Sequence, residues 1–102
     1  MPDPSSYEYE TVAVSQTDQV MGTSGAVGDY LDRIVCTVAT AATGTVSIKD
    51  GAAGSSIPLL AANTPIGVYA IPLGLKAATV ANPGWRVTTG AGVTCIAVGR
   101  FR

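Results

Sequence analysis

The sequence predicts an all-β protein, an antiparallel β-sandwich of about eight strands with an extended N-terminal arm. Jelly-roll-like wiring is the first expectation and immunoglobulin-like wiring the alternative. Three observations lead to this class. Val, Ile, Thr and Tyr recur in short runs, Gly, Pro, Asn and Ser separate the runs, and little of the chain has a helical period. At 102 residues the chain has room for one domain with a modest core.

The first 14 residues are predicted to form an extended arm or an edge strand, and residues 15–102 a single β-sandwich domain. The prolines and serines of "PDPSS" resist both helix and β-ladder. The following "YEYETVAV" alternates, so its tyrosines point to one side and its glutamates to the other. Such a segment suits a sheet edge or an arm that lies on a partner.

The next predicted strand is "DYLDRIVCTVAT", residues 29–40, which holds a dense group of reactive side chains. Under the two-residue period of a strand, Asp32 and Arg33 face opposite sides, and each pairs with a neighbouring strand or chain. Asp29 and Asp32 would also face apart in a strand, so they form no paired acid and base unless Asp29 lies in the loop. Beyond Arg33 both faces are mostly apolar or small, which is typical of a central strand whose charged end lies at the sheet rim.

The second half of the chain repeats short strands between turns. In "TVSIKDG" we expect Val46 and Ile48 to face inward. "SIPLLA" is a further short strand. "VYAIPLGL" contains Pro72, which cannot donate to a ladder, so this strand is at an edge or ends there. "WRVTT" and "VTCIAVGRF" are predicted to form a terminal hairpin around the turn at residues 90–92.

Charge and hydropathy narrow the function classes. The net charge is −1 with no basic run, so we expect no nucleic-acid partner and no polybasic membrane anchor. No hydrophobic leader follows the first residues and no apolar run approaches the length of a membrane span, so we expect synthesis in the cytoplasm. Every acid except Asp50 precedes the first base, Arg33. An acidic N-terminal part can therefore pair with a basic face of the same or of a neighbouring copy.

The chemistry of the chain points away from an enzyme. It contains no histidine, which removes Ser-His-Asp triads, Cys-His dyads and the commonest zinc ligand. "GTSGAVG" lacks the lysine and the following helix of a phosphate-binding loop. Cys36 and Cys95 sit in apolar runs and are expected to be small buried hydrophobes. We therefore expect no catalytic residue, no cofactor and no metal.

One alternative function rests on aromatic residues. An exposed aromatic ring can stack on a sugar, so Trp85 and Tyr69 are candidate glycan contacts of a small receptor-binding head-fibre or tail-tip module. For Trp85 we favour a place in the core or in an interface, because it is the largest side chain of a small domain.

Four segments together carry a family resemblance: "YEYETVAVSQTDQVMG", "GAVGDYLDRIVCTVATAATGTVSIKDG", "GVYAIPLGLK" and "GWRVTTGAGVTCIAVGRF". From about residue 6 to the end, the chain resembles small structural proteins from the head modules of tailed bacteriophages, of the decoration or cement type. The resemblance implies a jelly-roll or related β-sandwich that assembles as a dimer or trimer on the outside of the capsid lattice. It brings no catalytic residue.

The expected function is therefore that of a non-enzymatic virion protein on the capsid exterior that stabilises the shell. Its expected partners are the major capsid protein and itself, as a homotrimer or a dimer. Binding to the assembled shell lowers the free energy of that shell, so affinity and repetition suffice without chemistry. The candidate capsid or subunit contacts are Tyr7, Glu8, Tyr9, Glu10, Asp32, Arg33, Arg100 and Arg102.

Overall fold

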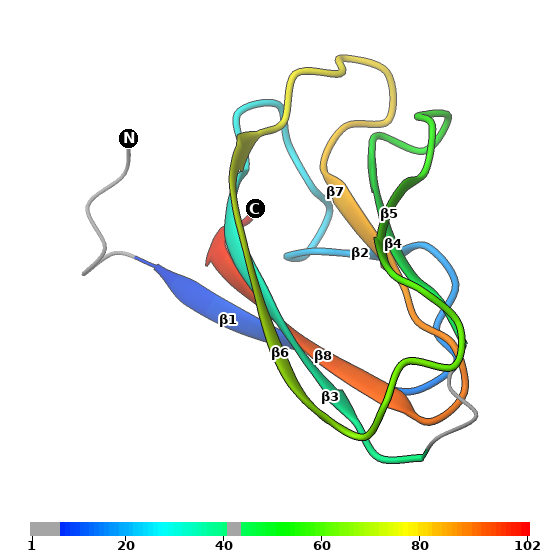
Figure 1. Cartoon of the computed structure of the whole chain (residues 1–102). Coiled ribbons are helices and arrows are strands. Elements are labelled where there is room, and N and C mark those ends of the chain that lie inside the picture. Colours follow the sequence, from blue (N-terminus) through cyan, green and yellow to red (C-terminus); the bar gives the residue numbers. More distant parts are fainter. Residues whose placement is uncertain (1–6, 41–43) are drawn as a thin grey trace.

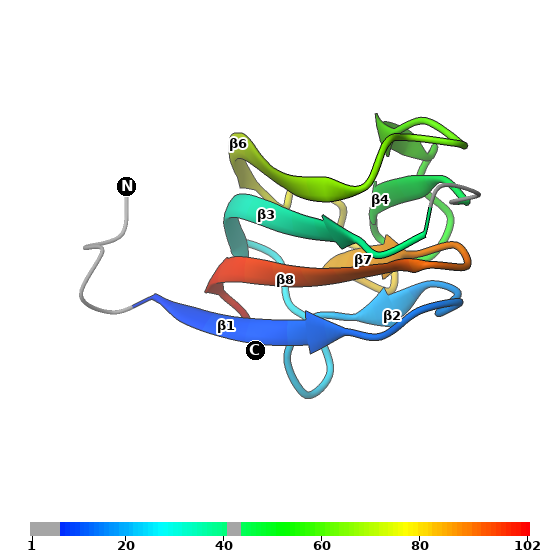
Figure 2. The ribbon, with the colours of Figure 1, turned by 60° about the horizontal axis from the view of Figure 1, so that its bottom comes forward.

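The computed structural model describes residues 7–40 and 44–102, and within them eight strands form two four-stranded antiparallel sheets. The sheets pack face to face, as Figures 1 and 2 show, so the predicted β-sandwich is confirmed. Sheet A contains, in spatial order, β1 (Glu8–Val12), β8 (Val93–Arg100), β3 (Tyr30–Val38) and β6 (Gly67–Lys76). Sheet B contains β2 (Gln19–Val20), β7 (Trp85–Thr88), β4 (Val46–Asp50) and β5 (Ile57–Leu60).

The strand order is that of a jelly roll. The first strand pairs with the last, β2 with β7, β3 with β6 and β4 with β5, as in one long hairpin that has been rolled into two sheets. Consecutive strands β1 and β2 lie in different sheets. This wiring differs from the immunoglobulin-like alternative, in which the first two strands share a sheet.

The predicted terminal hairpin is wrong, because β7 belongs to sheet B and β8 to sheet A. The connection at residues 89–92 crosses from one sheet to the other beside the connection from β1 to β2. There the Ser15 amide donates to the Gly90 carbonyl over 3.1 Å, and the Thr89 amide donates to the Gln16 carbonyl over 2.9 Å. These bonds pair backbone amide and carbonyl groups of the two connections, which lie outside the strand ladders. The glycine-rich turn signal therefore marks a crossing between sheets.

The core lies between the two sheets and is built by alternation along the strands. Val46 and Ile48 face inward and are buried, as predicted. Pro72 lies on β6, an edge strand of sheet A as predicted, and the strand continues through it to Lys76. The largest fully buried side chains are Met21, Leu31, Ile34, Ile48, Val12, Val38, Val46, Val87, Val93, Cys36 and Cys95.

The alternation of β3 breaks at a β-bulge. Its register with both β6 and β8 shifts between Leu31 and Arg33. As a result Leu31 and Ile34 are both buried, whereas Asp32 and Arg33 lie together at the surface with Arg33 Nη1 2.7 Å from Asp32 Oδ2. The prediction that these two charges face opposite sides is wrong, because the extra residue of a bulge shifts the two-residue period. Opposite the bulge, a Cβ at Gly99 would collide with the Tyr30 carbonyl.

Candidate functional site

The outward side of sheet A is unusually apolar. One row across the sheet runs from Tyr9 through Val98 and Arg33 to Pro72, and the next carries Ile96 and its neighbours. An outward antiparallel face is commonly polar. Arg100 and Lys76 alternate outward at one end of this side. The rest of it, which we call the outer face, has Arg33 as its one charged residue within the described set: Tyr9, Thr11, Arg33, Val35, Thr37, Val68, Ala70, Pro72, Thr94, Ile96 and Val98.

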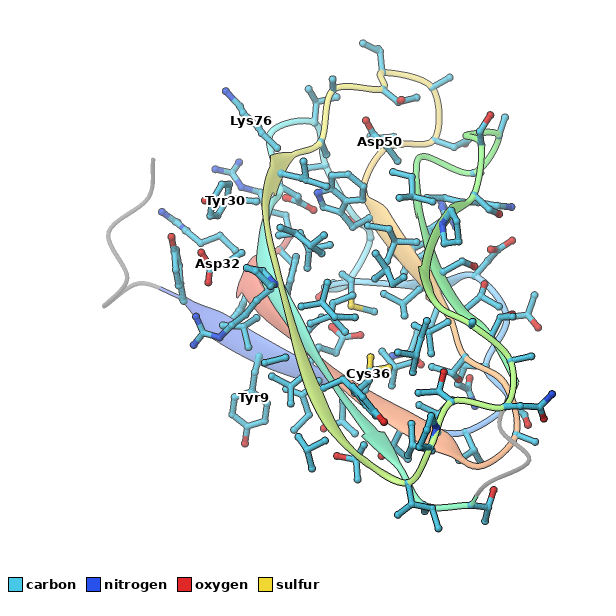
Figure 3. All side chains as sticks on the ribbon, in the orientation of Figure 1. Tyr9, Tyr30, Asp32, Cys36, Asp50 and Lys76 are labelled. Carbon is cyan, nitrogen blue, oxygen red and sulfur yellow. The ribbon has the colours of Figure 1, made fainter. Side chains whose placement is uncertain are left out.

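The outer face is open to solvent at both edges of the sheet. Tyr9 is 71% exposed on β1, and Val68 is 66% exposed on β6. In Figure 3 the Tyr9 ring projects away from the sandwich on the side of sheet A. A depression of about 460 Å³ next to Tyr9 is lined by Tyr7, Glu8, Tyr9, Arg33, Ile96 and Val98. The face therefore presents apolar side chains across its whole width.

Sheet B shows the opposite character on its outward side. The central strands β4 and β7 present polar residues there, namely Ser47, Lys49, Arg86 and Thr88. Lys49 Nζ lies 3.2 Å from Asp18 Oδ2, and the Thr88 hydroxyl donates to Asp18 Oδ1 over 3.1 Å. The Lys49 hydrogen bond, followed by that from Thr88, lowers the pKa of Asp18. The two outer sides of the sandwich are therefore chemically distinct.

The acids of β1 are bound within the chain. Glu10 accepts hydrogen bonds from Gln19 Nε2 over 3.0 Å and from the Gly22 amide over 2.7 Å. Glu8 accepts one from the Phe101 amide over 2.9 Å. Both carboxylates extend to the side of β1 opposite Tyr9 and attach this edge strand to sheet B and to the C-terminal segment. Their predicted role as outward contacts receives no support from this placement.

The two N-terminal tyrosines are placed differently. Tyr9 belongs to the outer face, whereas the ring of Tyr7 packs against that of Tyr30 with centroids 5.8 Å apart. Desolvation, and then the neighbouring Tyr30 and Asp32, raise the pKa of Tyr7. The sequence pattern could place these tyrosines on one side of the strand, but it could not find their different contacts.

Basic residues border the outer face at the end where β8 finishes. In the ladder, Tyr30 lies between Arg100 on one side and Lys76 on the other. Arg100 and Arg102 are exposed. They line, with Glu8, Gly28, Asp29, Tyr30 and Phe101, a pocket of about 260 Å³ at the end of the sandwich. These basic residues lie at one end of the apolar rows, whereas Arg33, paired with Asp32, lies within a row.

Asp29 has a structural role that sequence reasoning missed. It is only 3% exposed, and its Oδ2 accepts hydrogen bonds from the amides of Ala26 over 3.0 Å and Arg102 over 3.3 Å. Its carbonyl accepts from Ala77 and from the Trp85 indole. Glycine and aspartate are both frequent in turns, so Gly28 and Asp29 are a signal for a turn before this strand. Its role is to hold loops together.

The aromatic residues of the glycan alternative both lie on inward sides. Trp85 is 3% exposed and donates from Nε1 to the Asp29 carbonyl over 3.1 Å, so almost none of its ring can stack on a sugar. Tyr69 is half-buried on β6, packs against the core and donates from its hydroxyl to the Pro65 carbonyl over 2.7 Å. The expected core position of Trp85 is confirmed, and the two rings form no exposed platform.

Fold and surface together define a class, a jelly-roll β-sandwich domain with one apolar and one polar outer side. A scan against protein-family models and searches of curated proteins and of solved structures found no match. Within residues 7–40 and 44–102, no group of three or more His, Cys, Asp or Glu side chains could hold a metal ion. In the same residues no helix has the length and apolar character to cross a membrane.

Proposed function

We propose that this chain is a non-enzymatic virion structural protein that binds the outside of a phage capsid and stabilises the shell. The observation that carries the proposal is the outer face of sheet A, in which apolar side chains and threonines surround the single charge of Arg33. Contiguous apolar surface of this kind marks protein-interaction sites. The resemblance to phage decoration proteins supplies the identity of the partner, the major capsid protein.

The shape of the surface supports a protein partner. The outer face follows a β-sheet, and a small ligand would instead be enclosed in a concave pocket. Arg33 in the face and Arg100 and Lys76 at its border favour a capsid surface that is apolar with carboxylates around it. Salt should therefore weaken the binding only in part, since the apolar contact is insensitive to screening.

Self-association belongs to the same proposal. A homotrimer, or alternatively a dimer, would place several outer faces on one lattice site. Once one subunit of an oligomer is bound, the other subunits are held at a high effective concentration near their own sites. Contacts that are weak individually therefore give a high overall affinity. Sedimentation of the purified protein at several concentrations gives its oligomeric state directly.

The first prediction concerns a charge placed in the outer face. Val68→Lys on β6 should weaken binding to capsids assembled without this chain by at least about tenfold, because an unpaired ammonium would be buried in the contact. Val80→Lys provides a matched control, since Val80 is 79% exposed, comparable with 66% for Val68, and lies in the connection between β6 and β7. Co-sedimentation measures the affinity, and the temperature of particle rupture measures the stabilisation.

Two outcomes would contradict the proposal. If wild-type protein neither co-sediments with capsids nor raises their rupture temperature, the capsid-binding function is wrong. If it binds and Val68→Lys, Ile96→Lys and Val80→Lys all bind like wild type, the outer face is not the contact. Circular dichroism of each variant confirms that the fold is intact before binding is compared.

A further inference from the structure

The two cysteines of the chain lie directly opposite each other in the centre of sheet A. Cys36 on β3 is the register partner of Cys95 on β8. Both are buried and free, and their sulfur atoms are 3.2 Å apart, with the Cys95 thiol donating to Cys36 Sγ. Figure 3 shows Cys36 on the core side of the strand. The fold thus places the thiols of Cys36 and Cys95 in contact, although the two residues are 59 positions apart in sequence.

The backbone at this pair already suits a covalent bond. Directly opposed residues of an antiparallel ladder have Cα atoms about 4.5–5.5 Å apart, and disulfides accept about 4.4–6.8 Å. Both side chains leave the same face of the same sheet, because Cys36 and Cys95 alternate with outward residues on either side. Side-chain rotation with a small approach of the sulfurs would therefore be enough to form the bond.

We infer that Cys36 and Cys95 are a disulfide-forming pair, so that this protein has a dithiol state and an oxidised state in which a covalent bond joins β3 to β8. The inference is independent of the proposed capsid function, since it rests on the positions of two side chains inside one domain. A low-molecular-weight disulfide, for which glutathione disulfide is the probe, serves as the oxidant.

The reaction balances as two thiol–disulfide exchanges. The Cys36 thiolate attacks one sulfur of glutathione disulfide and releases a glutathione thiolate. The Cys95 thiolate then attacks the Cys36 sulfur of the mixed disulfide and releases the second glutathione. The two protons lost by the cysteines pass through solvent to the two glutathione thiolates, so the protein dithiol is oxidised and glutathione disulfide is reduced.

In the folded chain the hydrogen bond between the thiols makes their pKa values unequal, which favours Cys36 as the first nucleophile when an opening exposes the pair with this contact intact. The donation from Cys95 lowers the pKa of Cys36, and the same bond, reinforced by burial, raises the pKa of Cys95. Cys36 is therefore the first thiolate to form. Oxidation should accelerate as the pH rises, because the thiolate is the nucleophile.

Burial controls the rate of the reaction. Both sulfurs face the core, so an oxidant reaches them only when the sandwich opens locally. Glutathione disulfide should therefore act slowly on the folded protein and quickly when it is present during refolding from urea. The rate of oxidation in the folded protein reports access to the thiols, and the extent of oxidation during refolding reports whether the geometry allows the bond.

The test measures mass and thermal stability after each treatment. Wild-type protein refolded in glutathione disulfide should lose two hydrogen atoms in mass and resist alkylation under denaturing conditions, and dithiothreitol should restore both thiols. The bond closes a long loop, so the Tm should rise by an amount on the order of 10 °C. Cys36→Ala and Cys95→Ala are the matched controls, and neither should gain stability from the oxidant.

The wild-type measurements decide the question even if an alanine variant fails to fold. Two thiols that remain open to alkylation after refolding with excess oxidant would overturn the inference. A glutathione adduct or a dimer linked between chains as the end product would overturn it as well.

Discussion

At the scale of single residues, Asp29 shows how one buried carboxylate can organise a loop-rich end of a β-sandwich. Its side chain binds the amides of Ala26 and Arg102, and its carbonyl binds the Trp85 indole and the Ala77 amide. These partners come from four parts of the chain. The indole bond is buried and the two bonds to the carboxylate are partly buried, so each satisfies a donor that is at least partly withdrawn from water.

Replacing this carboxylate tests that role. Asp29→Ala should lower the free energy of unfolding by about 1–3 kcal/mol, because two amides lose their acceptor. Asp32→Ala is the control, since it removes the same group from a partly exposed ion pair and should cost less than about 1 kcal/mol. Urea unfolding followed by Trp85 fluorescence measures both. Equal losses in the two variants would show that Asp29 is no more than a surface charge.

At the scale of elements, the bulge of β3 decides which side chains enter the core. In an uninterrupted strand Leu31 and Arg33 would share a face, whereas here Leu31 is buried and Arg33 is exposed. The bulge thus adds a leucine to the core and brings Asp32 and Arg33 together outside. Bulges commonly re-aim side chains in this way.

The difference between these two positions can be measured. Leu31→Ala should lower the free energy of unfolding by about 2–5 kcal/mol, because it leaves a cavity in the core. Arg33→Ala should change it by less than about 1 kcal/mol, since its ion pair is exposed. Chemical denaturation of both variants provides the comparison. Similar effects at the two sites would indicate a regular strand without the bulge.

The sequence predicted well those elements whose pattern is local. Val46 and Ile48 alternate with polar residues, so their inward direction followed from period alone. Which residues of β3 face inward could not be predicted from this period, because the bulge arises from the register of β3 with β6 and β8. The partners of β8 were also predicted wrongly, since β8 pairs with β1 and β3, which are far away in sequence, and not with the adjacent β7. Pairing is a property of the whole sheet.

The candidate site was harder to predict than the fold. On β8, inward and outward residues are both apolar, so Ile96 and Val98 could not be told from core residues by composition. Glu8 and Glu10 carry the charge expected of a contact, yet their donors lie in the chain itself. Of the predicted contacts, Tyr9 and Arg33 lie on the outer face.

At the scale of the whole molecule, the rolled-hairpin order makes nearly all strand pairing non-local. The first strand meets the last, and among the strands of residues 7–40 and 44–102 only β4 and β5 are both paired and adjacent in sequence. Loop-closure entropy must be lost before such contacts form, so refolding of the reduced protein should take milliseconds to seconds. Stopped-flow fluorescence of Trp85, the only tryptophan, reports it. Refolding within microseconds would contradict this view.

The pairing of β1 with β8 also has a mechanical consequence. Glu8 lies opposite Gly99, so tension between residues 8 and 101 pulls on the ladder from one end. The hydrogen bonds of such a ladder then break one pair after another, as in unzipping, and bear little force together. Tyr9, one residue from the loaded end, would leave the outer face early. Under the capsid attachment that we propose, a swelling shell that pulled on these two positions would release this edge strand before it disturbed the remaining strands of either sheet.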